Sequence, residues 1–523
     1  MKHIKNILIA AMMILVLPFQ SCTLEEDTQG LSTPTDFFRK YSECQSVVNS
    51  CYIPLKSIYT YTMMIATECV TDVLSISSGT LDARLDISPA IPRHGATVWQ
   101  NGYLGVQRCN FAVEGIERAY ENEILTAEQY NQLICEAKTL RGFYYWLLTS
   151  FFGNVPFYFD DVTDNAVLSR IALLPRMDAN VTRATVIEDL LSCVEFAPQT
   201  RTSDNEGQRV GAALAYHLIA KMAMWNAYAQ TTEGAAHWWD VAKTALHKVE
   251  DIYGSLAQYD FTENALWRNH NTPESIMEIQ HIYVLGGLNY SSNVSCICMP
   301  HPRTTGTDIF DGVQLAFIGN QPTVWTAMRP NVYFSQGLQG RKSKDIRRNV
   351  NMAWDYTGED GVTRQFNSIN SKPWPGPKFW CPNQQASSDG NNYKIFRYSD
   401  AILMLAECYC ETGDYTTAVK YLDMTRTRAG LQGYVFRTVP RLQEEIRNER
   451  ARELFGDMQR KFDLVRWGIW YDLTTAYSDY KYLQKDNADT MIKPCHRFYP
   501  IPDVQVTYSK NNLDNKEYNA YGL

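Results

Sequence analysis

Apolar residues recur at helical spacing over much of the chain, most clearly from residue 397 to residue 430. One buried helix face there follows the i, i+3, i+4, i+7 order. Its members are Ile402, Leu405, Ala406 and Tyr409. A Gly-Asp pair at 413–414 interrupts the run, and a second periodic stretch continues to Gly430, a residue type that often ends helices. The pattern predicts two antiparallel helices joined by a tight turn.

Similar pairs of periodic runs occur elsewhere in the chain. They span 98–120 with 126–152, and 210–229 with 238–252. Hairpins built on units of about 34 residues are typical of tetratricopeptide repeats, although long insertions separate them here. Two more helical runs are expected near the N-terminus, at 36–60 and 63–74. The sequence therefore predicts an all-α dominated fold, an irregular tetratricopeptide-like scaffold of helical hairpins.

Two stretches depart from helical periodicity. Residues 274–283 have the composition of a short strand. From 285 to 392, Gly, Pro, Asn, Ser and aromatic residues replace the helical pattern. A long irregular region inside a compact protein is usually functional or disordered, and its aromatic content argues against disorder. We expect a loop-rich insertion, with a few short strands, that carries the ligand-binding part of the molecule.

The N-terminus has the features of a targeting segment. Basic residues precede an apolar stretch from Ile7 to Leu17 that is too short to span a bilayer, so residues 1–21 are predicted to be a signal peptide. The junction before Cys22 resembles a bacterial lipobox, which predicts lipidation of Cys22 and a tether over 22–35. The alternative is an ordinary secretory signal followed by a chance cysteine.

The composition of the chain excludes some classes of function. The net charge of −8 over 523 residues argues against a nucleic-acid partner. Twelve cysteines remain besides Cys22, many among apolar neighbours, where free cysteine behaves as a small hydrophobe. Two CxC pairs lack the second pair or histidine cluster of a zinc site. We therefore predict no cofactor and no metal, and one or two disulfides remain open.

Enzyme motifs are missing from the sequence. There is no nucleophile elbow, HExxH, Walker A loop or dinucleotide fingerprint. Carboxylate pairs at 160–161 and at 308 and 311 are the best acid–base candidates, and solvated carboxylates rarely catalyse. Residues 355–361 have some calcium-loop character without an EF-hand pattern, which favours a plain turn. A binding protein is expected, not an enzyme.

A dense run of mixed charges follows, from 442 to 468, and its alternating signs predict neutralising helix pairs. Its spacing resembles the C-terminal signature of the SusD/RagB-like outer-membrane nutrient-binding lipoproteins of Bacteroidota. The matching positions are Glu449, Arg450, Arg452, Glu453, Leu454, Arg460, Asp463, Leu464, Arg466 and Trp467. Gly456 and Met458 depart from that signature. Residues 140–157 and 498–518 resemble two further blocks of the family, so the resemblance spans the mature chain.

The resemblance implies an N-terminal SusD-like helical region over 36–270 and a C-terminal SusD/RagB-like region over 271–523. It also implies a lipid-anchored protein of the outer membrane that faces the cell exterior. Such a protein captures an extracellular glycan and passes it to a SusC-like TonB-dependent transporter. The alternative is a RagB-type subunit that takes up peptide or protein.

Ligand contacts implied by the resemblance come from two parts of the chain. The first part supplies Asp72, Arg84, Trp99 and Asn101. The loops supply Tyr290, Trp325, Trp354 and Trp374. Other roles stay open: Trp99 heads an amphipathic helix and fits a core position, and Asp72 fits a helix cap. Two of the loop tryptophans are expected to touch ligand.

Overall fold

The computed structural model describes most of the chain beyond the N-terminal targeting segment. The described residues run from 37 to 523 without 77–81, 163, 200–208, 285–286, 288–289, 300–308, 311–312, 315–316, 319–320, 323–326, 341, 358–361, 366–372 and 382–386. The predicted signal peptide, the tether and Cys22 lie outside the described residues, as does Trp325.

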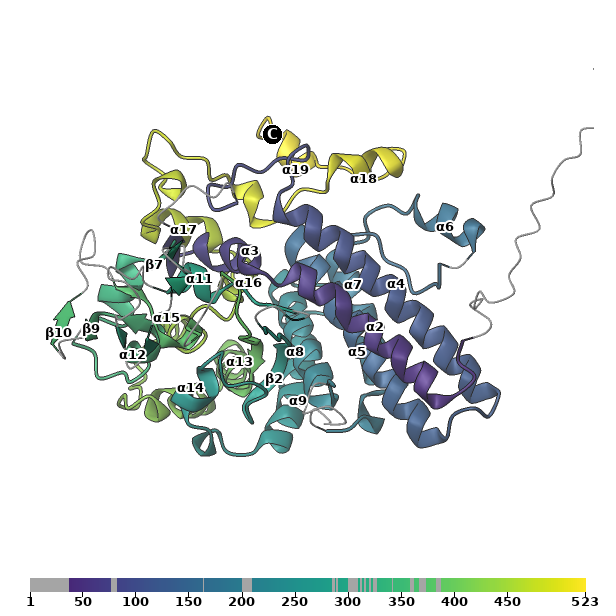
Figure 1. Cartoon of the computed structure of the whole chain (residues 1–523), viewed down its shortest axis with the longest axis horizontal. Helices are drawn as coiled ribbons and strands as arrows, with labels where there is room; N and C mark the ends of the chain where they lie inside the picture. Colours follow the sequence, from purple (N-terminus) through teal and green to yellow (C-terminus); the bar gives the residue numbers. More distant parts are fainter. Residues whose placement is uncertain are drawn as a thin grey trace, which may run out of the picture.

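Long helices form one side of the molecule and lie side by side in Figure 1. They are α2 (Tyr41–Ile58), α4 (His94–Glu121), α5 (Ala127–Phe152), α7 (Ala179–Leu191), α8 (Ala212–Ala229) and α9 (Ala235–Tyr253). The other side holds α13 (Tyr398–Glu411), α14 (Tyr415–Arg428), α15 (Val439–Glu453) and α16 (Arg460–Arg466). α4 packs on α5, α8 on α9, and α13 on α14. The prediction of an α-dominated fold with few short strands is confirmed.

Small residues and a cap explain why α4 and α5 pair so closely. A Cβ at Gly105 would collide with the ring of Tyr144, and one at Gly102 would lie 2.8 Å from Leu148. α5 begins with a capping box, because Thr126 Oγ1 accepts from the Gln129 amide while the Gln129 side chain accepts from the Thr126 amide. The sequence therefore fixes both the start of α5 and its distance from α4.

Short antiparallel strand pairs join distant parts of the chain. β2 (Ser275–Ile279) pairs with β12 (Tyr393–Arg397), which leads directly into α13. β1 (Leu74–Ile76) pairs with β7 (Met328–Pro330), and β8 (Met352–Ala353) with β11 (Trp374–Pro375). A further sheet has the order β10 (Thr363–Gln365), β9 (Asp355–Thr357), β3 (Ile309–Phe310), β4 (Val313–Gln314). The strand expected at 274–283 is present as β2.

One predicted helix is wrong in part. The run from 63 to 74 starts in α3 (Tyr61–Met64), continues as the π-helix η2 (Ile65–Cys69), and ends in β1. Glu68 in η2 accepts the Gln459 and Arg460 amides at 2.8 and 3.1 Å, at the start of α16. The wider π turn thus places a buried carboxylate against another helix.

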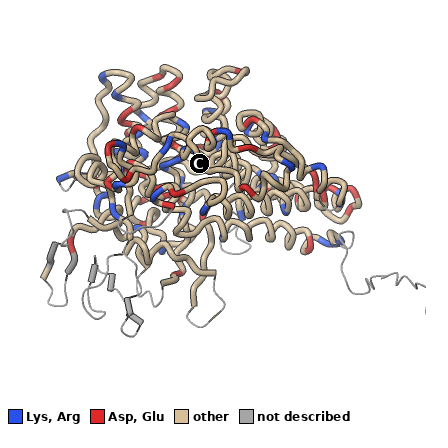
Figure 2. Tube along the Cα trace, turned by 90° about the horizontal axis from the view of Figure 1, so that it is seen from above, with Lys and Arg blue, Asp and Glu red and all other residues tan. Residues whose placement is uncertain are grey.

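Most of the mixed charges of α15 and α16 are buried, whereas Arg441 and Glu444 near the start of α15 are exposed. Arg452 with Glu449 and Arg466 with Asp463 are the pairs expected along one helix. Most partners come from elsewhere, since Arg450 binds Asp400 of α13 at 2.8 Å. Figure 2 shows both signs of charge interspersed along the chain, which agrees with a network of pairs. These residues hold the C-terminal helices together.

Candidate functional site

Tyrosine rings and one arginine gather where the segment before α4 meets the segment after α17 (Trp470–Tyr477). Arg84 Nε donates to the Tyr480 hydroxyl at 3.4 Å, and its guanidinium lies 4.6 Å from the Tyr482 ring centroid. The Tyr480 and Tyr482 rings meet edge to face, with centroids 5.2 Å apart. All three side chains are partly exposed. The arrangement offers ring faces and edges next to a guanidinium.

A second pair of rings adjoins the first. Tyr333, which opens the π-helix η5 (Tyr333–Leu338), stacks on Tyr477 with ring centroids 3.9 Å apart and planes at 18°. The Val332 amide donates to Asp479 Oδ2 at 2.7 Å, which ties η5 to the segment that carries Tyr480. We call Arg84, Tyr333, Tyr477, Tyr480 and Tyr482 the tyrosine surface.

Asp72 lies beneath this surface and not on it. The side chain is fully buried, and its two oxygens accept from Arg460 Nε at 2.9 Å and Nη2 at 2.6 Å. Burial, followed by the Asp72 carboxylate, raises the pKa of Tyr333 to about 12, which places Asp72 near the tyrosine pair. The expected ligand contact at Asp72 is therefore corrected to an internal ion pair, because a bidentate carboxylate with no exposed surface has nothing to offer a ligand.

Trp99 and Asn101 sit in the first half of α4. Trp99 is only 5% exposed and packs against Tyr103 and Phe152, with ring centroids 4.9 and 5.0 Å away. Its expected contact with ligand is corrected to a core position. Asn101 is half-buried, and its Nδ2 donates to the Thr97 carbonyl one turn earlier at 3.0 Å.

The loop tryptophans divide between the sheet region and the undescribed part. Trp374 of β11 lies opposite Ala353 of β8, and the Arg329 guanidinium of β7 stacks on its ring. Since Arg329 is the register partner of Ser75, Trp374 lies close to β1. Trp354 is half-buried and packs on the main core. These two tryptophans remain ligand contacts by prediction.

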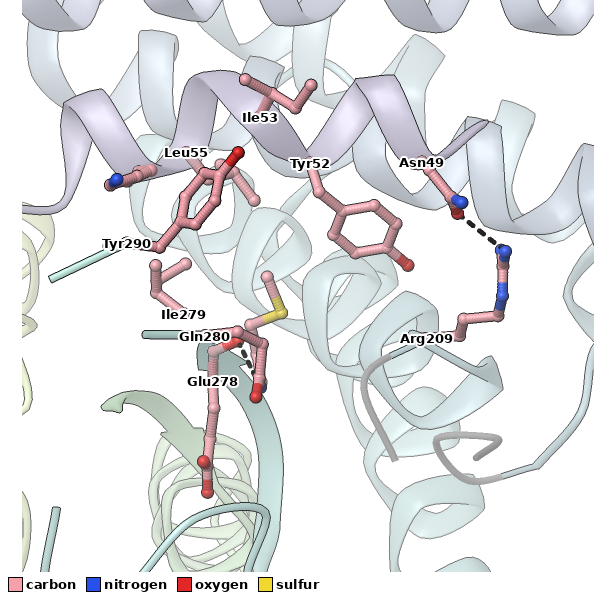
Figure 3. A pocket seen from close by; sticks show the side chains of 11 residues that line it. Asn49, Tyr52, Ile53, Leu55, Arg209, Glu278, Ile279, Gln280 and Tyr290 are labelled. Atoms are coloured by element: carbon pink, nitrogen blue, oxygen red, sulfur yellow. Dashed lines mark hydrogen bonds between the residues drawn. The ribbon is translucent and has the colours of Figure 1, made fainter. Parts of the chain in front are cut away.

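Tyr290 belongs to a different place. It lines a cavity of about 280 Å³ between α2 and β2, shown in Figure 3. The lining side chains come from α2, from the residues just before α8, from β2 and from the segment after β2: Asn49, Tyr52, Ile53, Leu55, Lys56, Arg209, Met277, Glu278, Ile279, Gln280 and Tyr290. The residues expected to share one ligand site are thus split between the region of the tyrosine surface and this cavity.

Sequence reasoning missed the four tyrosines of the tyrosine surface. Three of them fall within six residues, 477–482, at the last residue of α17 and just after it. Closely spaced tyrosines were the available signal. Their partner Tyr333 lies 144 positions earlier, and no local pattern connects the two.

The described part of the chain offers few candidates for catalytic or metal-binding residues. No group of three or more His, Cys, Asp or Glu side chains there could hold a metal ion. Asp160 is paired with Arg170 at 2.7 Å, while Asp308 and Asp311 lie outside the described residues. The twelve described cysteines are free thiols, and all but Cys381 are buried. None of the described helices combines the length and apolarity needed to cross a bilayer.

Two family models match the chain. The model described as "SusD family" matches residues 320–518, and the model described as "Starch-binding associating with outer membrane" matches residues 36–222. A curated relative, SusD-like protein P25 of Formosa agariphila, is 23% identical over 96% of this chain and 97% of its own length.

Solved structures show the same fold. A SusD homolog from Bacteroides thetaiotaomicron VPI-5482 has a TM-score of 0.73 at 18% identity and covers 91% of this chain and 97% of its own. A SusD superfamily protein from Bacteroides vulgatus ATCC 8482 reaches 0.70 at 19% identity, over 92% and 100% of the two chains. The surface glycan-binding protein A of Bacteroides thetaiotaomicron in complex with laminarihexaose reaches 0.66 at 20%, over 90% and 98%. Together with the family models, which match both halves of the sequence, these findings show that the chain belongs to the SusD/RagB-like family.

Proposed function

We propose that this chain is a lipid-anchored surface protein that captures an extracellular glycan and delivers it to a SusC-like TonB-dependent transporter. The observation that carries the proposal is the tyrosine surface on a SusD fold. Sugar rings have apolar C–H faces that pack on aromatic rings and hydroxyl edges that need polar partners. The tyrosine rings can supply the first, and Arg84 together with the tyrosine hydroxyls the second.

Rigidity supports a binding role for this surface. Tyr333 and Tyr477 hold each other by stacking, and the guanidinium of Arg84 bridges Tyr480 and Tyr482. A surface that is ordered before the ligand arrives loses less conformational entropy on binding. Capture without turnover is the activity we expect, because the same groups offer no isolated acid, base or nucleophile.

Relatives indicate the ligand class. Similar structures include a laminarin binding SusD-like protein and a surface glycan-binding protein in complex with laminarihexaose. We therefore expect a β-glucan or another neutral glycan to be the first ligand to test. The partner transporter, the outer-membrane location and the anchor at Cys22 follow from the family and belong to the proposal. Trp354 and Trp374 are the loop residues that we assign to an extension of the same surface.

The test uses the protein from Thr23 onward in calorimetry and affinity electrophoresis. The ligands are laminarihexaose, maltohexaose, xylohexaose and a mixed peptide pool. Replacing Tyr480 and Tyr482 together by Ala should weaken glycan binding about tenfold or more, since two ring faces are lost. Tyr508→Ala is the matched control, because Tyr508 ends α18 (Asp503–Tyr508) and is 68% exposed.

The outcomes of this test distinguish the candidate functions from one another. Saturable glycan binding that the double variant abolishes and Tyr508→Ala preserves supports the proposal. Binding of peptide alone, unchanged by the double variant, would favour the RagB-type alternative and make the tyrosine surface structural. Release of reducing ends during incubation would instead indicate a glycosidase.

A further inference from the structure

The cavity between α2 and β2 has an apolar interior and an apolar rim. Leu55, Met277 and Ile279 form its buried lining. Two lining side chains, Ile53 and Tyr290, and Ile282, which is paired with Tyr290, are more than half exposed. Ile282 and Tyr290 exchange backbone hydrogen bonds of 2.9 Å, which fixes the Tyr290 segment beside the cavity. Exposed apolar side chains that gather around a cavity mark a binding site more often than a bare surface.

Two of the charged groups that line the cavity are already neutralised. Arg209 Nη1 donates to both oxygens of Glu136 at 3.1 and 2.9 Å, and Nη2 donates to Asn49 Oδ1 at 2.7 Å. Glu278 is paired with Lys394 at 2.7 Å. Because these ions are paired within the protein, neither favours a ligand of one particular charge.

Lys56 is the exception among the charged lining residues. It has no acidic partner in the described part of the chain, and its ammonium lies 4.1 Å from the centroid of the Tyr290 ring. The cation–π contact covers one side of the ring, while Tyr290 remains 60% exposed. One uncompensated positive charge therefore stands at the mouth of an apolar cavity.

We infer that this cavity binds a small carboxylate with a single aromatic ring. The ring would enter among Leu55, Met277 and Ile279 and pack against Tyr290, and the carboxylate would pair with the Lys56 ammonium. A volume of about 280 Å³ suits one ring with a short side chain. Sugar rings fit this interior less well, since most of their hydroxyl groups would face apolar side chains. The site is separate from the tyrosine surface and does not depend on the proposed glycan capture.

The probe is 3-phenylpropanoate, compared with its neutral amide and with methyl β-D-glucopyranoside. Binding is followed by ligand-observed NMR titration of the protein from Thr23 onward. A ligand of this size should bind with a Kd on the order of millimolar. The amide should bind about fivefold more weakly, because it lacks the ion pair with Lys56.

Two variants and their controls locate the contact. Lys56→Gln should remove the preference for acid over amide, and Tyr290→Ala should weaken the binding of both. Lys420→Gln is the matched lysine control, because Lys420 also lies near a tyrosine ring, 5.7 Å from that of Tyr421. Tyr508→Ala is the matched tyrosine control, and both controls should bind as the parent does.

Three results would overturn the inference. The first is equal binding of acid and amide to the parent protein. The second is a preference for the acid that survives Lys56→Gln. The third is tighter binding of the glucoside than of the acid, lost in Tyr290→Ala, which would make the cavity a sugar site. Equal melting temperatures of parent and variants confirm that each change is local.

Discussion

At the scale of single residues, Lys461 is the most unusual cation of the described chain. Its side chain is 3% exposed, and its ammonium has no hydrogen-bond partner there. The Trp470 and Tyr499 rings lie 5.1 and 4.9 Å away. Burial lowers the pKa of Lys461 to about 7, and Asp82 opposes this shift only in part. The folded protein thus holds a lysine that is close to losing its charge at neutral pH.

Lys461→Met should stabilise the protein at low pH. The unfolded lysine keeps its proton up to about pH 10.4, whereas the folded lysine loses it near pH 7. Between these values the unfolded state binds more protons, so the stability of the parent rises with pH. The advantage of Lys461→Met should therefore be largest below pH 7 and shrink toward pH 10. Urea unfolding of both proteins from pH 6 to pH 10 measures the difference, and a constant difference would contradict the shifted pKa.

Residue identity alone did not distinguish surface from core. The sequence around Asp72 fits a ligand contact and a helix cap equally, and its true partner, Arg460, lies 388 positions away. Trp99 likewise fits both a ligand contact and a core position, and its contact with Phe152 identifies it as a core residue. A carboxylate or an aromatic ring can pack in the core or bind a ligand at the surface. Only its tertiary contacts therefore show which role it has.

At the scale of elements, α15 joins the C-terminal half through Glu453. Its carboxylate accepts from Arg347 at 2.8 Å, from Arg397 at 3.0 Å and from Arg428 at 2.5 Å. Burial opposes ionisation, yet the three guanidinium groups hold the pKa of Glu453 well below its ordinary value. One carboxylate therefore connects α15 to α14, to β12 and to the segment before α12 (Arg348–Asn351).

Glu453→Ala should cost about 3–5 kcal/mol of the free energy of unfolding, because three buried cations lose a shared partner. Glu444→Ala is the matched control on the same helix. Glu444 pairs with Arg441 at 2.8 Å in a largely exposed position, so its loss should cost under about 1 kcal/mol. Denaturant titration of both variants tests the contrast. Similar costs for the two changes would show that the buried network adds little.

Elements with one apolar stripe were predictable, and elements buried on all sides were not. The hairpins around α5, α9 and α14 followed from period and turn residues. From Met63 to Ile76 every side chain is buried, so neither a helical nor an alternating pattern is visible. That run was predicted as one helix and contains α3, η2 and β1.

At the scale of the whole molecule, three separated blocks of sequence located the family, and the fold agrees over more than nine-tenths of the chain. The tyrosine surface, where we propose that the ligand binds, was harder to predict. Its tyrosines come from η5, from the end of α17 and from the segment after α17, which meet only in the folded chain. The helical hairpins of the scaffold repeat one local geometry, which a periodic sequence pattern can predict. The proposed site forms where separate loops meet, and loop sequences have little periodicity.

At the same scale, we propose that attachment of the whole protein to a membrane depends on one residue, Cys22. The anchor that we propose is a set of acyl chains on Cys22, because the junction before this residue resembles a lipobox. In cells that lack a partner transporter, the full chain should sediment with membranes, and Cys22→Ser should appear in the soluble fraction after a high-salt wash. Cys381→Ser is the matched control, since Cys381 is the one described cysteine that is not fully buried. Membrane retention of Cys22→Ser through that wash would mean that contacts of the protein itself, and not acyl chains, hold it at the surface.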